Sequence, residues 1–255
     1  MKLWLNITVF TPLWLLLDKA YVGPASQIMF MKHITVLLAE DHRVVRAGFR
    51  KLLDAEVDLE VVGEAQNGRQ AVELTRKFRP AVVVMDIAMP LLNGLEAARQ
   101  IRKAFPDTKV VMLSAHSDDA YVDQAIAVGA VGFLLKQTSS YNLSEAIREV
   151  QNGNTFFSPS IAKRLGNHQP KSPNGGGLLK KKIARLTSRE VEVLQLIAQG
   201  NADKHTAAEL GISVKTVEKH RQNLMAKLNI HEISGLTRYA IGAGIIESSV
   251  QLTIR

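Results

Sequence analysis

Five polar side chains of this sequence come at the ends of short apolar runs, and their types suit phosphoryl transfer. Glu40 and Asp41 follow one run, Asp86 ends a second, and Ser114 and Lys136 follow two more. Clustered carboxylates repel one another, and an oxygen-seeking divalent cation such as Mg²⁺ relieves the repulsion. A carboxylate such as that of Asp86 can act as a nucleophile and form an acyl phosphate. Mg²⁺ and Lys136 would then neutralise the phosphoryl oxygens.

Each of these residues alone also has an ordinary structural interpretation. Lys136 suits a surface lysine, and Ser114 suits a cap at the end of a strand. Taken jointly they favour chemistry, because every group would lie at a strand end, where open α/β sheets bind their ligands. Ser114 could there donate its hydroxyl to an attached phosphoryl group.

The apolar runs are short, which is typical of strands buried on both faces of a parallel sheet. The central run, Ala81–Pro90, reads AVVVMDIAMP. A helical pattern follows the runs, as when Val45, Phe49 and Leu52 recur behind the first. Strand–helix units that repeat in this way predict an α/β fold with a doubly wound, five-stranded parallel sheet. Besides the central run, the expected strands are Ile34–Ala39, Leu59–Ala65, Lys109–Leu113 and Val131–Leu135.

Length and charge indicate a second domain with a different partner. The 255 residues allow two ordinary domains, and a hydrophobic content of 46% is enough for real cores. Residues 31–153 carry 15 Lys/Arg and 16 Asp/Glu, whereas residues 180–255 carry 12 and 7. A basic second part suggests a nucleic-acid surface, although a solvated basic face would look the same. The chain has no cysteine, which excludes disulfides and thiolate metal sites.

Residues 1–30 differ in character from the rest of the chain, and two interpretations compete. Lys2 precedes an interrupted apolar run from Leu3 to Leu17, which loosely resembles a signal peptide but is too short and broken for a membrane span. The segment is either a secretory or anchoring signal or an upstream extension outside the fold, with Met31 as the functional start. We favour the extension, because export would separate the chemistry above from its partners.

The segment Ile34–Gly153 resembles the receiver domain of bacterial two-component response regulators. The resemblance implies a flavodoxin-like fold over residues 31–153 and phosphotransfer from a sensor histidine kinase to Asp86. It implies that Ser114 and Phe133 act as switch residues, and that Mg²⁺ is held by Glu40, Asp41, Asp86 and the backbone carbonyl of Ala88. Many receivers have proline after the lysine, where this chain has Gln137. The matching residues are Glu40-Asp41, Asp86, Met89-Pro90, Gly94, Ser114-Ala115 and Lys136.

Residues 154–183 are rich in Pro, Gly, Ser and Asn, and this composition predicts a flexible linker. Order is expected to return over residues 184–250. Thr187 and Glu190 have capping-box spacing at a helix start. A short helix over Lys204–Leu210, a turn at Gly211-Ile212 and a third helix capped by Ser213 come next. This outline is typical of a helix-turn-helix, whose second helix enters a major groove.

The segments LTSREVEVLQLIAQG and LGISVKTVEKHRQNLMAKLNI resemble the LuxR-type DNA-binding domain. With the receiver they indicate a NarL/FixJ-type response regulator. The helical pattern puts Val214, Val217, Leu224 and Leu228 inward, and the resemblance places the recognition helix at Val214–Lys227. A fourth helix is expected over Glu232–Gly242; the resemblance implies that it dimerises the DNA-bound form, and it can at the same time close the small core. Thr206 departs from the isoleucine usual in the family. The expected DNA contacts are Lys215 and Thr216 to phosphates, and Lys219 and Gln222 near base edges.

We therefore expect a cytoplasmic, phosphorylation-dependent transcriptional regulator of a two-component phosphorelay, with Mg²⁺ as cofactor, and not an enzyme. Its expected partners are a sensor histidine kinase, promoter DNA, RNA polymerase as a further candidate, and a second copy of the chain when phosphorylated, with no membrane partner. One alternative is a hydrolase with Asp86 as phosphoryl carrier, but haloacid dehalogenase-type phosphatases need a second acid where this chain has Ala88. Another is a DNA-binding protein that works without phosphorylation.

Overall fold

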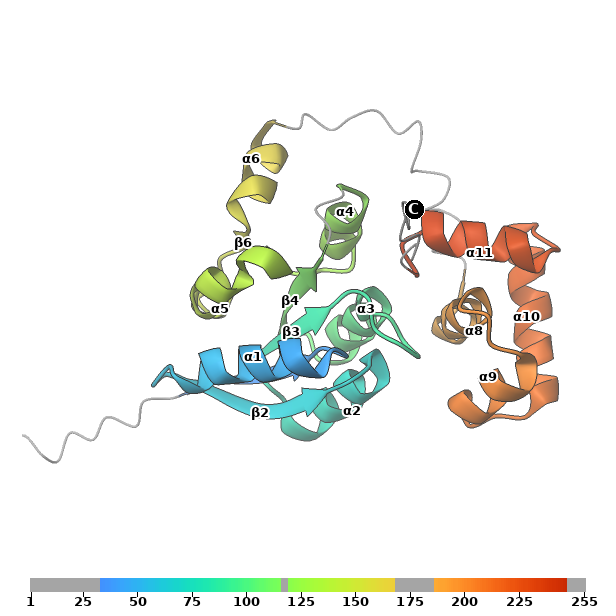
Figure 1. The fold of residues 1–255 in the computed structure, drawn as a ribbon, viewed down its shortest axis with the longest axis horizontal. Helices are drawn as coiled ribbons and strands as arrows, with labels where there is room; N and C mark the ends of the chain where they lie inside the picture. Colours follow the sequence, from blue (N-terminus) through green and yellow to red (C-terminus); the bar gives the residue numbers. More distant parts are fainter. Residues whose placement is uncertain (1–32, 116–118, 168–185, 247–255) are drawn as a thin grey trace, which may run out of the picture. The chain divides into compact units, whose positions relative to one another are not determined.

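The computed structural model describes residues 33–115, 119–167 and 186–246 (Figure 1). The expected N-terminal extension over residues 1–30 lies outside the described residues, as do residues 168–183 of the expected linker and residues 247–250 of the expected second domain. Among the described helices, none combines the length and apolar character that a membrane span requires.

A parallel α/β sheet forms the core of the first domain, as the sequence predicts. In the described residues it has six strands in the order β2-β1-β3-β4-β5-β6. The first five are those expected from the apolar runs. The sixth is a two-residue addition at the edge, where Phe156 pairs with Gly132 of β5. The strands are β1 (Ile34–Ala39), β2 (Leu59–Ala65), β3 (Val82–Asp86), β4 (Lys109–Ser114), β5 (Gly132–Leu135) and β6 (Phe156–Phe157).

The beginning of the expected linker is structured. β6 is followed by helix α6 (Pro159–Asn167), and Ile161 of this helix is buried in the same core as Phe133. The chain therefore stays with the sheet beyond residue 153, which differs from the prediction of a flexible segment from residue 154. Two strand residues carry too little periodicity to be recognised in a sequence.

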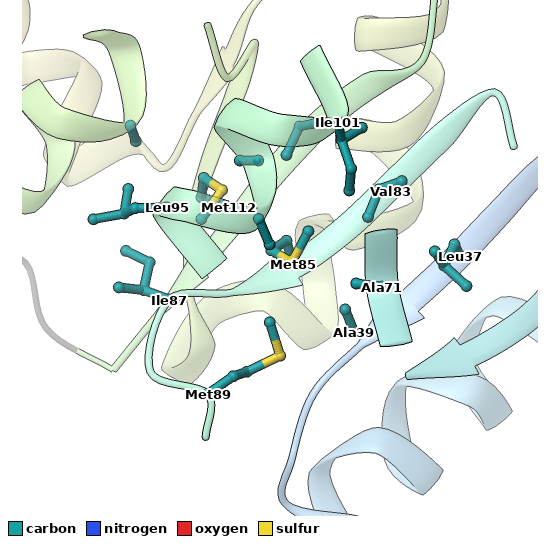
Figure 2. Packing of buried hydrophobic residues seen from close by; sticks show 14 of the residues in the cluster. Leu37, Ala39, Ala71, Val83, Met85, Ile87, Met89, Leu95, Ile101 and Met112 are labelled. Atoms are coloured by element: carbon teal, nitrogen blue, oxygen red, sulfur yellow. The ribbon is translucent and has the colours of Figure 1, made fainter. Parts of the chain in front are cut away.

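Helices cover both faces of the sheet, and the alternation of side chains along each strand divides the core in two. Val82 and Val84 pack with α1 and α5, whereas Val83 and Met85 pack with α2, α3 and α4. Figure 2 shows Met85 and Met112 on the second face, in the same group of side chains as Ile101. The helices are α1 (Arg43–Asp54), α2 (Gly68–Phe78), α3 (Gly94–Ala104), α4 (Asp119–Ala127) and α5 (Lys136–Gln151).

One detail of the helical spacing differs from expectation. In α1 the buried residues include Phe49 and Leu53, while Leu52 is 38% exposed. The expected series from Val45 and Phe49 ended at Leu52, three positions after Phe49. Because i+3 and i+4 positions both lie near one face of a helix, sequence spacing alone does not choose between adjacent leucines.

The second domain is a small all-helical unit with well-defined helix ends. Thr187 and Glu190 form the expected capping box at the start of α8, and Ser213 caps α10 by accepting a hydrogen bond from the Thr216 amide. Gly211 ends α9 in the left-handed region, at φ 61°, where glycine avoids a Cβ clash. The helices are α8 (Ser188–Ala198), α9 (Asp203–Leu210), α10 (Val214–Leu228) and α11 (Ile233–Gly242).

The apolar face of α10 closes this domain's core. Val217, Leu224 and Leu228 are fully buried, and Leu236 and Tyr239 of α11 belong to the same cluster. Val214 was expected to face inward with them but is 39% exposed. It is the first residue of α10, where fewer neighbouring side chains cover it.

Thr206 in α9 is fully buried, and its Oγ1 atom has no hydrogen-bond partner among the described residues. A buried hydroxyl without a partner costs about 1–3 kcal/mol of stability. We therefore predict that Thr206→Val, which keeps the shape and removes the hydroxyl, raises the free energy of unfolding of this domain by about 1 kcal/mol. Scanning calorimetry of the full chain measures this as a higher melting temperature of the domain.

Thr206→Ser is the matched control, since it keeps the hydroxyl and loses the buried methyl group, and it should lower the melting temperature. A Thr206→Val variant less stable than the unaltered chain would contradict the prediction.

Candidate functional site

The first acidic pair stands at the end of β1. Glu40 and Asp41 follow the buried Ala39, and the Glu40 side chain is 1% exposed. The chain here is held by Arg46 of α1, whose guanidinium donates to the backbone oxygen of Glu40 at 2.7 Å and to the Glu64 carboxylate at 3.1 Å. The Arg46 guanidinium therefore fixes the loop from which both acids project.

Asp86 ends β3, the neighbouring strand, and is likewise almost fully buried. Lys136 begins α5 directly after β5. Its Nζ atom lies 3.0 Å from Asp86 Oδ1 and 2.8 Å from Glu40 Oε2, with the lysine side chain 17% exposed. The structure thus brings the ammonium group and the carboxylates from three separate strand ends into direct contact.

These residues fit a divalent cation. One ligand atom each from Glu40, Asp41, His42 and Asp86 can be chosen so that all lie within 4.8 Å of one another. Asp86 Oδ2 is buried and has no hydrogen-bond partner in the described part of the chain. A buried carboxylate oxygen without a donor is costly unless a cation accompanies it. An oxygen-rich pocket of this kind is the usual environment of Mg²⁺.

The loop after Asp86 contains Ala88, the residue expected to offer its carbonyl to the cation. The loop is closed by Gly94, whose amide donates to the Ile87 carbonyl at 2.9 Å. A Cβ atom at position 94 would overlap the carbonyl oxygen of Asp86. The glycine is therefore required by close approach of two backbones, which explains its place in the motif.

Ser114 and Phe133 lie on the strands nearest Lys136. Ser114 ends β4, is 2% exposed, and stands in register with Leu135, which precedes Lys136. Asp86 is in register with Leu113. Ser114 is therefore at the same edge of the sheet as the acids. Phe133 is fully buried in the core on β5, and its role as a switch stays a prediction.

The residues expected to contact DNA share the outer part of α10. Lys215, Lys219 and Gln222 are exposed, and Thr216 is half-buried with its hydroxyl 2.8 Å from that of Ser213. They start at the helix N-terminus and recur at three- and four-residue spacing, so they lie on one side, away from the buried leucines. Their contacts with DNA stay predictions.

Electrostatics make Asp86 unusually easy to protonate. Burial and the nearby Glu40 carboxylate raise its pKa to about 6, against the lowering effect of Lys136. Burial also works to lower the pKa of Lys136, but the Asp86 and Glu40 carboxylates outweigh it and the net pKa is raised. The two shifts agree physically: one ammonium group serves two carboxylates, so it is well neutralised and they are not.

Sequence reasoning missed two neighbours of the acids. His42 directly follows the acidic pair, and its Nδ1 atom lies 2.9 Å from Asp41 Oδ1 and 3.1 Å from Glu40 Oε1. Arg46 lies one helical turn later. Adjacency to Asp41 was a signal for His42. No local pattern marks Arg46, because a buried arginine and a surface arginine look alike in a sequence.

Comparisons with known proteins match both domains. Residues 36–148 match the family model described as the response regulator receiver domain, and residues 184–240 match that of the bacterial regulatory proteins of the luxR family. The chain is 36% identical to the transcriptional regulatory protein DegU of Brevibacillus brevis over 210 residues, which cover 78% of this chain and 89% of that protein.

Two further relatives match this chain over nearly their own full length. The chain is 32% identical to the response regulator protein VraR of Staphylococcus aureus over 84% of this chain and 99% of VraR. Among solved structures, that of the response regulator RcsB in complex with DNA is similar, with a TM-score of 0.51 and 26% identity over 82% of this chain and 98% of RcsB.

The raised pKa of Asp86 predicts a specific dependence of stability on pH. Below about pH 4 the carboxyl is protonated in folded and unfolded chains alike. Between about 4 and 6 the folded state binds more protons, so this group's contribution to stability falls as pH rises and stays low above 6. A rise of the Asp86 pKa from 3.8 to about 6 corresponds to about 3 kcal/mol. Asp86→Asn should therefore stabilise the metal-free protein more at pH 8 than at pH 4.5.

Scanning calorimetry of the full chain in EDTA at both pH values measures this difference. Asp107→Asn, at an exposed acid just before the amino end of β4, controls for the loss of one negative charge. An equal effect of Asp86→Asn at both pH values would show that Asp86 is not held in the way the contacts indicate.

Proposed function

Because the chain belongs to the response regulators that join a receiver domain to a LuxR-type DNA-binding domain, we propose that Asp86 accepts a phosphoryl group from a sensor histidine kinase. The observation that carries the proposal is the contact of Lys136 Nζ with both Asp86 and Glu40, at 3.0 and 2.8 Å. It places a fixed cation beside the carboxylate that would receive the negative phosphoryl group.

The transfer is a displacement at phosphorus. An Asp86 carboxylate oxygen forms the new phosphorus–oxygen bond while the phosphorus–nitrogen bond to the kinase histidine breaks, and the nitrogen keeps the electron pair. Lys136 neutralises a phosphoryl oxygen, and Ser114 donates its hydroxyl to the attached group. Glu40, Asp41, Asp86 and the carbonyl of Ala88 would hold Mg²⁺, which supplies further positive charge to the phosphoryl oxygens when bound.

The output is binding to promoter DNA. We infer that Lys215 and Thr216 contact phosphates and that Lys219 and Gln222 lie near base edges, since their side chains start from one exposed side of α10. Phosphate contacts position a protein, and base contacts specify the sequence. The response regulator RcsB, which matches 82% of this chain, has been solved in complex with DNA. We propose that phosphorylation favours a homodimer that forms through α11 and binds two DNA half-sites. RNA polymerase is proposed as a further partner, and the cytoplasm as the place where the protein acts.

Acetyl phosphate is a small phosphoryl donor that tests the acceptor without the cognate kinase. We predict that Asp86→Ala abolishes labelling of the full chain, because the nucleophile is removed, and that EDTA abolishes labelling of the unaltered chain. Phosphate-affinity electrophoresis measures the labelled fraction. Asp107→Ala serves as the control and should label normally. Label that persists on Asp86→Ala would refute the site.

Operator binding tests the second domain, with an operator selected from random DNA. We expect Lys219→Ala to weaken binding to this operator about tenfold and to relax its sequence preference, as for loss of a base contact. Lys215→Ala should weaken binding to all sequences alike and reduce the salt slope by about one. Fluorescence anisotropy measures both, with Lys51→Ala in α1 as a control of equal charge. The assignment of roles fails if the two variants behave identically.

A further inference from the structure

We propose that His42 is a ligand of the cation pocket and that it gives this pocket a preference for nitrogen-seeking transition-metal ions, such as Co²⁺ and Zn²⁺, over Mg²⁺. The proposal rests on the cation site of the proposed function and adds a donor of a different chemical class. Carboxylate and carbonyl oxygens suit Mg²⁺, whereas an imidazole nitrogen favours later first-row metals.

The positions of the donor atoms support a shared ion. His42 Nδ1 lies 2.9 Å from Asp41 Oδ1 and is hydrogen-bonded to Glu40 Oε1 at 3.1 Å. Adjacent ligands of an octahedral ion with bonds of about 2.1 Å are about 3.0 Å apart. Ligand atoms of these three residues and of Asp86 all lie within 4.8 Å of one another, so only a slight contraction would bring them around one ion.

The pocket also contains oxygens that hydrogen bonds do not satisfy. Asp86 Oδ2 is buried without a hydrogen-bond partner among the described residues, in a residue that is 1% exposed. Asp41 Oδ1 has none by geometry either, although it lies 2.9 Å from His42 Nδ1. Asp41 Oδ1 and His42 Nδ1 are thus close together without being aligned for a hydrogen bond, and two ligands of one metal ion have the same arrangement.

The backbone explains why the imidazole faces the acids. His42 is the N-cap residue of α1, and its side chain makes no capping hydrogen bond. Its backbone amide instead donates a hydrogen bond to Glu40 Oε1 at 3.1 Å, which holds His42 close to the Glu40 carboxylate. The ring is 67% exposed, so a metal ion reaches it from solvent.

An ion pair between a protonated imidazole and the acids is the competing explanation, and it predicts the opposite result. If His42 only contributes positive charge, its removal strengthens the binding of every divalent cation, because the pocket becomes more negative. If His42 is a ligand, its removal weakens the binding of Co²⁺ and leaves the oxygen-bound Mg²⁺ nearly unchanged.

The experiment measures Co²⁺ and Mg²⁺ binding to the full chain by titration calorimetry, with visible absorption of Co²⁺ to report a nitrogen ligand. We expect His42→Ala to weaken Co²⁺ binding at least ~tenfold and to change Mg²⁺ binding less than about twofold. Asp86→Asn should weaken the binding of both Co²⁺ and Mg²⁺. His205→Ala removes an exposed histidine of α9 and controls for adventitious binding to surface imidazoles.

Equal Co²⁺ binding by His42→Ala and the unaltered chain would overturn the inference, as would a parallel change for both ions. Either result leaves the proposed function intact, provided that the chain binds Mg²⁺ through Asp86. Failure of the unaltered chain to bind any divalent cation would instead count against the proposed function itself.

Discussion

The candidate site of the receiver domain depends on one contact, that of the Lys136 ammonium group with two buried carboxylates. Glu40 and Asp86 lie at the ends of adjacent strands, and their negative charges repel at close range in a region of low dielectric. Lys136 comes from β5, and β4 lies between β5 and β3. The lysine side chain therefore reaches across the end of β4, where Ser114 stands, and contacts both acids at once.

That contact leaves the pocket short of positive charge. One ammonium group faces Glu40, Asp41 and Asp86, and the pKa of Asp86 rises to about 6 because burial and Glu40 outweigh Lys136. A divalent cation bound by these carboxylates would supply the missing positive charge. The pocket thus combines a buried carboxylate with a deficit of positive charge, which is consistent with the proposed phosphoryl acceptor and its divalent metal.

The helical domain achieves its stability by different means. Its apolar core is supplemented by well-defined helix ends: a capping box begins α8, Ser213 begins α10, and Gly211 permits the turn between α9 and α10. The cost of a defect is correspondingly high, and the buried hydroxyl of Thr206 is such a defect. Leu224 and Leu228 lie on the buried side of α10, so the polar residues that follow the cap lie on the opposite, exposed side.

The sequence by itself determined the order of strands and helices, the caps, and the identity of the residues that could do chemistry, because apolar periodicity and capping are local properties of the chain. Only the tertiary structure decided which leucine of Leu52 and Leu53 is buried, that β6 extends the sheet, and that His42 and Arg46 stand beside the acids. Those outcomes depend on strand order, register and the rotation of each helix against the sheet. For Arg46 and β6 the local sequence carries no sign of these neighbours, whereas His42 is adjacent to Asp41 in the sequence and only the direction of its ring was decided by the fold.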